Sequence, residues 1–117
     1  MNHIKNSLIS SIIEKEGLFM ANVLKYFKEN QEILDLYTTA ITRAHKEHHP
    51  EVFSVKKIYT AIQDKIQSSI TDTINLDLEF TELRKLTNNY AIPTDVCPTF
   101  VATYHMLEQA DHIYEEI

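Results

Sequence analysis

The sequence predicts an all-α protein, an antiparallel four-helix bundle behind an N-terminal helical extension. Three observations predict this fold class. Apolar residues recur at helical spacing in successive segments, the pattern of helices that bury one face. The 117 residues include one glycine and three prolines, too few for the many tight turns of a β-rich fold. The connections between segments are short, which favours antiparallel neighbours.

The first segment, residues 4–16, carries isoleucine and leucine at helical spacing, and Gly17 follows it as a suitable C-cap. We therefore divide the chain into an extension over residues 1–17 and a bundle domain over residues 18–117. The sequence leaves open whether Gly17 separates two helices or lies within one long helix.

Two long amphipathic segments open the bundle domain. The first runs from residue 18 to about residue 48. The second begins at Pro50, whose missing N–H is tolerated in a first helical turn, and extends to residue 70. Their apolar faces consist of Met20, Val23, Leu24, Phe27, Leu34, Ile41 and His45, and of Val52, Val55, Ile58, Tyr59, Ile62, Ile66 and Ile70.

Two further helices complete the bundle. The third covers about residues 76–89, and Asn88 and Asn89 can end it because asparagine tolerates the left-handed conformation. Thr94 or Asp95 can cap the last helix, which extends to Ile117. Their apolar faces consist of Leu76, Phe80, Leu83, Leu86 and Tyr90, and of Val96, Cys97, Phe100, Tyr104, Leu107, Ala110, Tyr114 and Ile117.

Charge and composition exclude several classes of function. The net charge of −6 opposes binding to nucleic acid and to anionic membranes. No segment approaches transmembrane length, and polar residues interrupt the N-terminal apolar run too early for a signal peptide. The single cysteine, Cys97, excludes an internal disulfide and fits a reducing cytosol. We expect a cytoplasmic protein without nucleic-acid or membrane partners, and homo-oligomer formation stays open.

Three of the six histidines, His45, His48 and His49, lie within five residues at the junction of the first two bundle helices. Imidazole is the commonest metal ligand in proteins. His45 and His49 have the i,i+4 spacing that lets two rings reach one metal, and Glu51 follows closely. The alternative is that these histidines cap the last carbonyls of the helix and favour its negative dipole end. From spacing alone the structural role is favoured.

Antiparallel topology places Cys97 at the same pole as the histidines. We therefore expect its thiol to come within side-chain reach of His45 and His49. An inward-facing cysteine is by default a small buried hydrophobic residue, but a thiol beside histidines is also a candidate metal ligand.

A second polar group lies on the last helix, where His105, Glu108, His112 and Glu116 form one stripe. This stripe points away from the apolar face, so we expect it to be solvated. Glu79 is expected to pair with a lysine of a neighbouring helix. The chain contains no nucleotide-binding motif and no nucleophile–base pair, so we do not expect turnover of an organic substrate.

Two segments resemble the short members of the Ric family (repair of iron centres; YtfE/ScdA-like), which are iron–sulfur cluster repair proteins. Residues 42–53 (TRAHKEHHPEVF) resemble the helix corner of that family, and residues 80–100 (FTELRKLTNNYAIPTDVCPTF) resemble the stretch leading into its last helix. The resemblance implies a hemerythrin-like bundle, which in full-length members holds a non-haem di-iron centre. Those proteins help to restore clusters damaged by nitric oxide or oxidants. The resemblance also places His45 where the family has a first-helix iron ligand.

The chain departs from this family in its ligands. It lacks the N-terminal domain with paired cysteines, its second bundle helix has no histidine, and His112 is out of register with the family's last-helix ligand. A complete di-iron set needs about five to seven ligands. The helix corner offers His45, His48 or His49, Glu51 and Cys97.

These observations lead to two functional hypotheses. The first is a cytosolic accessory protein in iron–sulfur cluster repair under stress. It would bind iron, as a mono- or di-iron site with an incomplete ligand set, through the His-rich corner, and act on iron–sulfur proteins or another protein. The alternative is a metal-free helical protein-interaction module.

Overall fold

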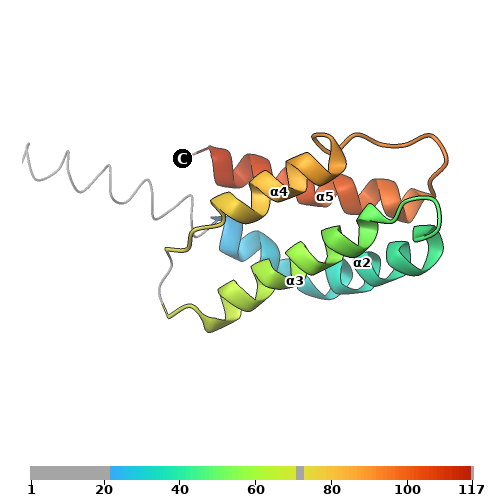
Figure 1. Cartoon of the computed structure of the whole chain (residues 1–117). Coiled ribbons are helices and arrows are strands. Elements are labelled where there is room, and N and C mark those ends of the chain that lie inside the picture. Colours follow the sequence, from blue (N-terminus) through green and yellow to red (C-terminus); the bar gives the residue numbers. More distant parts are fainter. Residues whose placement is uncertain (1–21, 71–72, 117) are drawn as a thin grey trace, which may run out of the picture.

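Helices are the regular elements of the computed structural model, which describes residues 22–70 and 73–116. Helical residues 22–29 precede four helices, which are α2 (Gln31–His45), α3 (Glu51–Ser68), α4 (Asp77–Thr87) and α5 (Pro98–Glu115). Successive helices run in alternate directions (Figure 1). The predicted all-α fold is thus confirmed, and no strand occurs in the described residues. The predicted extension over residues 1–17 lies outside them.

Each helix has two neighbours in space. The helix α2 packs against α3 and α5, and α3 packs against α4. Side chains join α4 to α5, since the rings of Phe80 and Tyr114 lie 5.1 Å apart and Arg84 pairs with Asp111 at 2.7 Å. One apolar core therefore lies between all four helices. Each large side chain that it buries completely contributes roughly 1.5–3 kcal/mol relative to exposure.

The buried positions follow the helical periodicity of the sequence. The exceptions have local causes. Ile70 is fully exposed because α3 ends at Ser68, before the turn that would have brought Ile70 to the core. Asp111 is buried on α5 although it is charged. The core consists of Val23, Leu24, Phe27, Leu34, Ile41, Val52, Val55, Tyr59, Ile62, Ile66, Ile74, Leu76, Phe80, Leu83, Tyr90, Phe100, Tyr104, Leu107, Ala110 and Tyr114.

The long first helix of the bundle domain is interrupted at Asn30 and ends before residue 48. The side-chain amide of Asn30 donates to the carbonyl of Tyr26 at 2.8 Å, beside the backbone N–H of Asn30 at 3.0 Å. A side chain that competes for a backbone acceptor loosens the helix locally. The regular helix ends at His45, and the backbone N–H of His49 closes the next turn on the His45 carbonyl at 2.7 Å.

The last helix starts later than the sequence predicts. Neither Thr94 nor Asp95 caps it, because Cys97 occupies the N-cap position and Pro98 is the first helical residue. A residue before proline is forced into extended backbone, and Cys97 has φ −81° and ψ 166°. The helix can therefore begin only at Pro98. This start holds Cys97 in the loop that faces the end of α2.

The turn after α4 is left-handed over three residues. Asn88, Asn89 and Tyr90 have φ values of 51°, 58° and 61°. The predicted ending at the two asparagines is confirmed, but an aromatic residue in this conformation was not expected from the sequence. The bonds that hold the turn include those from the backbone N–H of Asn89 to the Arg84 carbonyl at 2.8 Å and from that of Tyr90 to the Thr87 hydroxyl at 2.8 Å.

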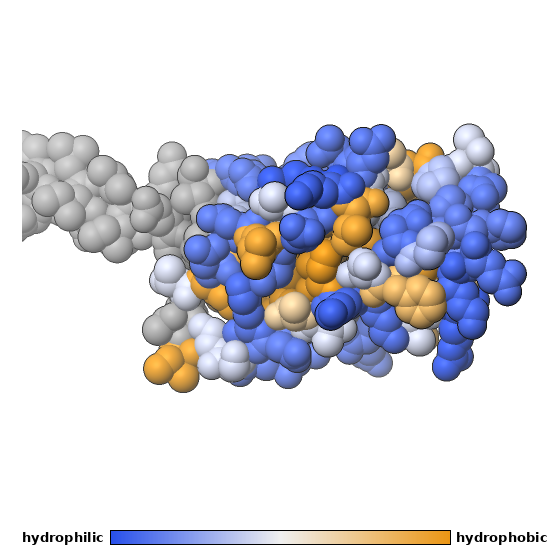
Figure 2. Space-filling model, in the orientation of Figure 1, coloured by the Kyte–Doolittle hydropathy of each residue, from blue (hydrophilic) through white to orange (hydrophobic). Residues whose placement is uncertain are grey.

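Most of the face in Figure 2 is hydrophilic, with hydrophobic side chains gathered over α3 and α4. The predicted ion pair of Glu79 is confirmed, since its carboxylate lies 2.8 Å from the Lys65 ammonium of α3.

Within the described ranges, none of the helices is both long and apolar enough to cross a membrane.

Candidate functional site

Three segments meet at one pole of the molecule and bring polar side chains together. These are the end of α2, the start of α3 and the loop before α5 (Figure 1). We use the term corner for the five residues that make contact there, which are His45, His49, Glu51, Asp95 and Cys97. The sequence-based prediction that Cys97 comes within reach of the histidines is confirmed for His45, whose Nε2 lies 3.2 Å from Cys97 Sγ.

His45 presents one ring nitrogen to the loop. The backbone N–H of Cys97 points to Nε2 of His45 at 3.5 Å, and a backbone N–H can only donate. Nε2 accepts this bond, with its lone pair directed at Cys97, in the tautomer that carries the ring proton on Nδ1. The edge of the ring packs against Phe100, with centroids 5.3 Å apart, which fixes the orientation of the half-buried imidazole.

His49 has both ring nitrogens engaged by carboxylates. Nδ1 lies 3.1 Å from Glu51 Oε1, and Nε2 lies 2.8 Å from Asp95 Oδ1. Carboxylates accept only, so both nitrogens donate and the ring is an imidazolium in this arrangement. The hydrogen bond to Asp95 is the main cause that raises the pKa of His49, and the bond to Glu51 adds to it. The same pair lowers the pKa of Asp95.

The remaining predicted site residue, His48, stands apart. It is exposed and makes none of the corner contacts, although its charge helps to lower the pKa of Asp95. The sequence-based hypothesis included His48 and omitted Asp95. Asp95 could have been found from its position in the connection between two helices, two residues before Cys97 at the same pole. The sequence pattern predicts a helix cap at this position instead.

The corner does not present a closed set of metal ligands. Among the described residues, no group of three or more His, Cys, Asp or Glu side chains is arranged to hold one metal ion. The rings of His45 and His49 lie 6.3 Å apart, and the nitrogens of His49 point to carboxylates. The residues therefore fit at most a small site based on His45 and Cys97. They do not fit the di-iron centre that the resemblance implies.

The second polar group that the sequence contains is solvated, as predicted. His105, His112 and Glu116 are exposed on α5, and Glu108 is half-buried. They take no part in the contacts among His45, His49, Glu51, Asp95 and Cys97, which makes them suitable control positions.

The comparisons with known proteins add no relative. No family model, no curated protein and no solved structure matches the chain. The assignment of a function therefore depends on the chemistry of the corner and on the resemblance described above.

Proposed function

We propose that the protein is an accessory factor in the repair of iron–sulfur clusters, with a hemerythrin-like bundle and an iron-binding corner. The observation that carries the proposal is the pair of His45 and Cys97. The imidazole lone pair and the sulfur face each other at 3.2 Å. A nitrogen and a sulfur that share a tetrahedral metal lie about 3.5 Å apart, given metal–ligand bonds of about 2.0–2.1 and 2.3 Å. A small separation of the two side chains would make room for the ion.

The other corner residues explain why binding would be weak and transient. His49 can act as a ligand only after it loses a proton and leaves Asp95, to which it is bound at 2.8 Å. Glu51 is a further donor once its bond to His49 opens. Uptake of iron therefore competes with an internal ion pair, and affinity should fall as the pH drops through the histidine range. Weak, competitive binding is better suited to handing iron to a partner than to retaining a permanent cofactor.

The partner in this proposal is an iron–sulfur protein or a protein that delivers iron to one. The alternative function is a metal-free helical interaction module. One observation favours the alternative, because large apolar side chains remain exposed on the helices, with Leu36 64% and Phe53 54% accessible. Both hypotheses describe an accessory protein, and they differ in whether the corner binds metal.

Metal content separates the two hypotheses. Freshly purified protein would be loaded with Fe(II) without oxygen, or with Zn(II) as a surrogate, and its metal-to-protein ratio measured by elemental analysis. The test variant is His45→Ala with His49→Ala, and the control is His105→Ala with His112→Ala on the exposed stripe of α5. Far-UV circular dichroism would confirm that both variants fold. Asp95→Ala is included as a third variant. It removes the carboxylate that binds Nε2 of His49 and so leaves this nitrogen free to bind metal.

The proposal predicts metal in the wild type and in the α5 control, little metal in the corner variant, and tighter binding in Asp95→Ala. Negligible metal in all four proteins would leave the interaction module as the function. Equal and substantial metal in the wild type and the corner variant would move the site to His105, His112 and Glu116.

A further inference from the structure

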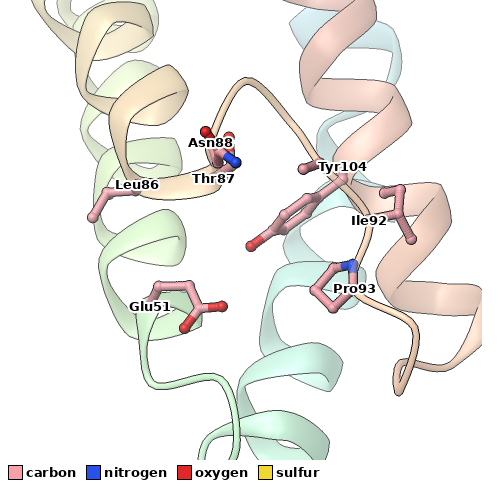
Figure 3. Close-up of a pocket in the computed structure, with 8 residues that line it drawn as sticks. Glu51, Leu86, Thr87, Asn88, Ile92, Pro93 and Tyr104 are labelled. Carbon is pink, nitrogen blue, oxygen red and sulfur yellow. The ribbon is translucent and has the colours of Figure 1, made fainter.

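A pocket of about 240 Å³ adjoins the corner and shares Glu51 with it. The start of α3, the end of α4, the left-handed turn and α5 surround it (Figure 3). Glu51 and Tyr104 point toward one another from opposite walls (Figure 3). The lining consists of Glu51, Leu86, Thr87, Asn88, Ala91, Ile92, Pro93 and Tyr104.

The hydroxyl of Tyr104 is an unpaired polar group at this pocket. Its residue is 1% exposed, and the described residues offer the hydroxyl oxygen no hydrogen-bond partner. The other buried tyrosines differ in this respect. The hydroxyls of Tyr59, Tyr90 and Tyr114 donate to Asp35, Asp111 and Asp77 at 2.7, 2.7 and 2.6 Å. A buried polar group without a partner is costly, and the exception here is the tyrosine that faces a cavity.

The two polar groups of the pocket have complementary chemistry. Burial raises the pKa of Tyr104, and the charge of Glu51 raises it further, so the phenol keeps its proton and can donate a hydrogen bond. Glu51 offers an accepting carboxylate whose Oε1 already binds His49. Among the residues that line the pocket, Glu51 is the one with a charged side chain. The pocket therefore favours a cation.

The remaining walls set the size and character of the occupant. Leu86, Ala91, Ile92 and Pro93 are apolar, and the Thr87 hydroxyl is already bonded to the Leu83 carbonyl at 2.7 Å. A volume of about 240 Å³ is below the usual range of about 300–1,000 Å³ for ligand pockets. A ligand of roughly this size with an apolar body matches these walls.

We propose that this pocket binds a small organic amine, with its ammonium group against Glu51 and an oxygen atom that accepts the hydrogen bond of Tyr104. The proposal is independent of the proposed function, because it needs no metal. Glu51 belongs to both the pocket and the corner, so the two proposals are tested with different ligands and different readouts.

The test uses three related probes on chelator-treated full-length protein, followed by two-dimensional NMR. The first probe, 2-amino-1-phenylethanol, has the amine, the oxygen and an apolar ring. The second, 2-phenylethylamine, lacks the oxygen, and the third, 1-phenylethane-1,2-diol, lacks the amine. The proposal predicts that the first probe shifts the amide signals of residues 86–92 and binds at least tenfold more tightly than the diol. Because the three probes are compared on the wild-type protein, this test does not depend on the folding of any variant.

Two variants then assign the contacts. Tyr104→Phe removes only the hydroxyl, and it should weaken binding of 2-amino-1-phenylethanol about threefold to tenfold while leaving 2-phenylethylamine within about twofold. Glu51→Gln should weaken both amines about tenfold or more and leave the diol unchanged. Equal affinities for the diol and the amines, equal losses for both amines in Tyr104→Phe, or shifts confined to other residues would each overturn the proposal. Metal analysis does not enter this readout, so failure here leaves the proposed function standing.

Discussion

The buried tyrosines differ in whether their hydroxyl groups have hydrogen-bond partners. Tyr59 and Tyr104 are both buried in the core, at 2% and 1% exposure. The hydroxyl of Tyr59 donates to Asp35 Oδ1 at 2.7 Å and accepts from Gln63 Nε2 at 3.0 Å. The hydroxyl of Tyr104 has no such partner among the described residues. The first hydroxyl therefore stabilises the fold, and the second forms no bond within the described ranges that would do so.

This contrast gives a prediction for stability. Tyr59→Phe should lower the free energy of unfolding by about 1–2 kcal/mol, because Asp35 and Gln63 lose a buried partner. Tyr104→Phe should leave it unchanged or raise it, because no bond is lost and an unpaired buried hydroxyl is removed. Urea unfolding of the two matched variants measures both values. A larger loss in Tyr104→Phe than in Tyr59→Phe would contradict this account of the pocket.

The ion pair of His49 and Asp95 predicts a pH window of stability. The pKa of His49 is raised above its ordinary value of 6.5, so its contribution is complete below that pH and is lost as the pH rises through the folded-state value. The pKa of Asp95 is lowered below 3.8, so its contribution is complete above that pH and is lost as the pH falls through the folded-state value.

The pair should therefore stabilise the protein most between pH 3.8 and 6.5. Asp95→Asn should reduce the free energy of unfolding at pH 6 more than at pH 9. Denaturant unfolding across this pH range provides the measurement. A difference between wild type and variant that is the same at both pH values would show that the pair does not contribute through charge.

The sequence predicts which residues meet at the corner better than it predicts their chemical state. The chain positions of His45, His49, Glu51 and Cys97 were sufficient to place them together. The charge state of His49 could not be predicted, because it depends on Asp95, which lies 46 residues away in a loop. The unpaired hydroxyl of Tyr104 was also inaccessible to pattern analysis, because helical periodicity shows which side chains are buried and not which polar atoms find partners.

Between elements, one buried charge joins α4 to α5. Asp111 is 2% exposed and binds Arg84 through two hydrogen bonds of 2.7 and 2.8 Å. The hydroxyl of Tyr90 also donates a hydrogen bond to Asp111 Oδ2 at 2.7 Å. Because Tyr90 belongs to the left-handed turn after α4, the same carboxylate also fixes the turn that lines the pocket. Asp111 thus links the packing of two helices to the shape of the candidate ligand site.

Asp111→Ala should lower the free energy of unfolding by about 2–4 kcal/mol, because it leaves Arg84 and Tyr90 without their buried partner. Glu115 is the matched control, since it binds the same guanidinium at 2.6 Å but is 57% exposed. Glu115→Ala should cost less than about 1 kcal/mol. Calorimetry or chemical denaturation distinguishes the two variants, and equal losses would show that burial does not strengthen this ion pair.

The elements themselves were largely predictable, because amphipathic periodicity determines which face of a helix is buried. The boundaries were less so. The break at Asn30 arises from a side-chain bond to Tyr26, and the late start of α5 arises from the extended backbone that Pro98 imposes on Cys97. The burial of Asp111 requires an arginine on another helix, which no single-helix pattern reveals.

For the whole molecule, the alternating directions of the helices bring distant parts of the sequence to one pole. Four helical segments in alternate directions place the α2–α3 junction and the loop before α5 at one pole (Figure 1). Imidazole, carboxylate and thiol groups that are up to 52 residues apart therefore meet there. The chain as a whole is acidic, with a net charge of −6. An acidic molecule of this kind attracts cations toward its surface.

The central claim is that His45 and Cys97 together bind a metal ion. Cobalt(II) tests it most directly, because a cobalt–thiolate bond produces an intense near-ultraviolet charge-transfer absorption that nitrogen and oxygen ligands do not. We predict that anaerobic titration of the wild type with cobalt(II) produces this band. The band should be absent from Cys97→Ser and from His45→Ala, and unchanged in His105→Ala. A wild-type protein without the band, or a Cys97→Ser variant with the same spectrum as the wild type, would contradict the claim.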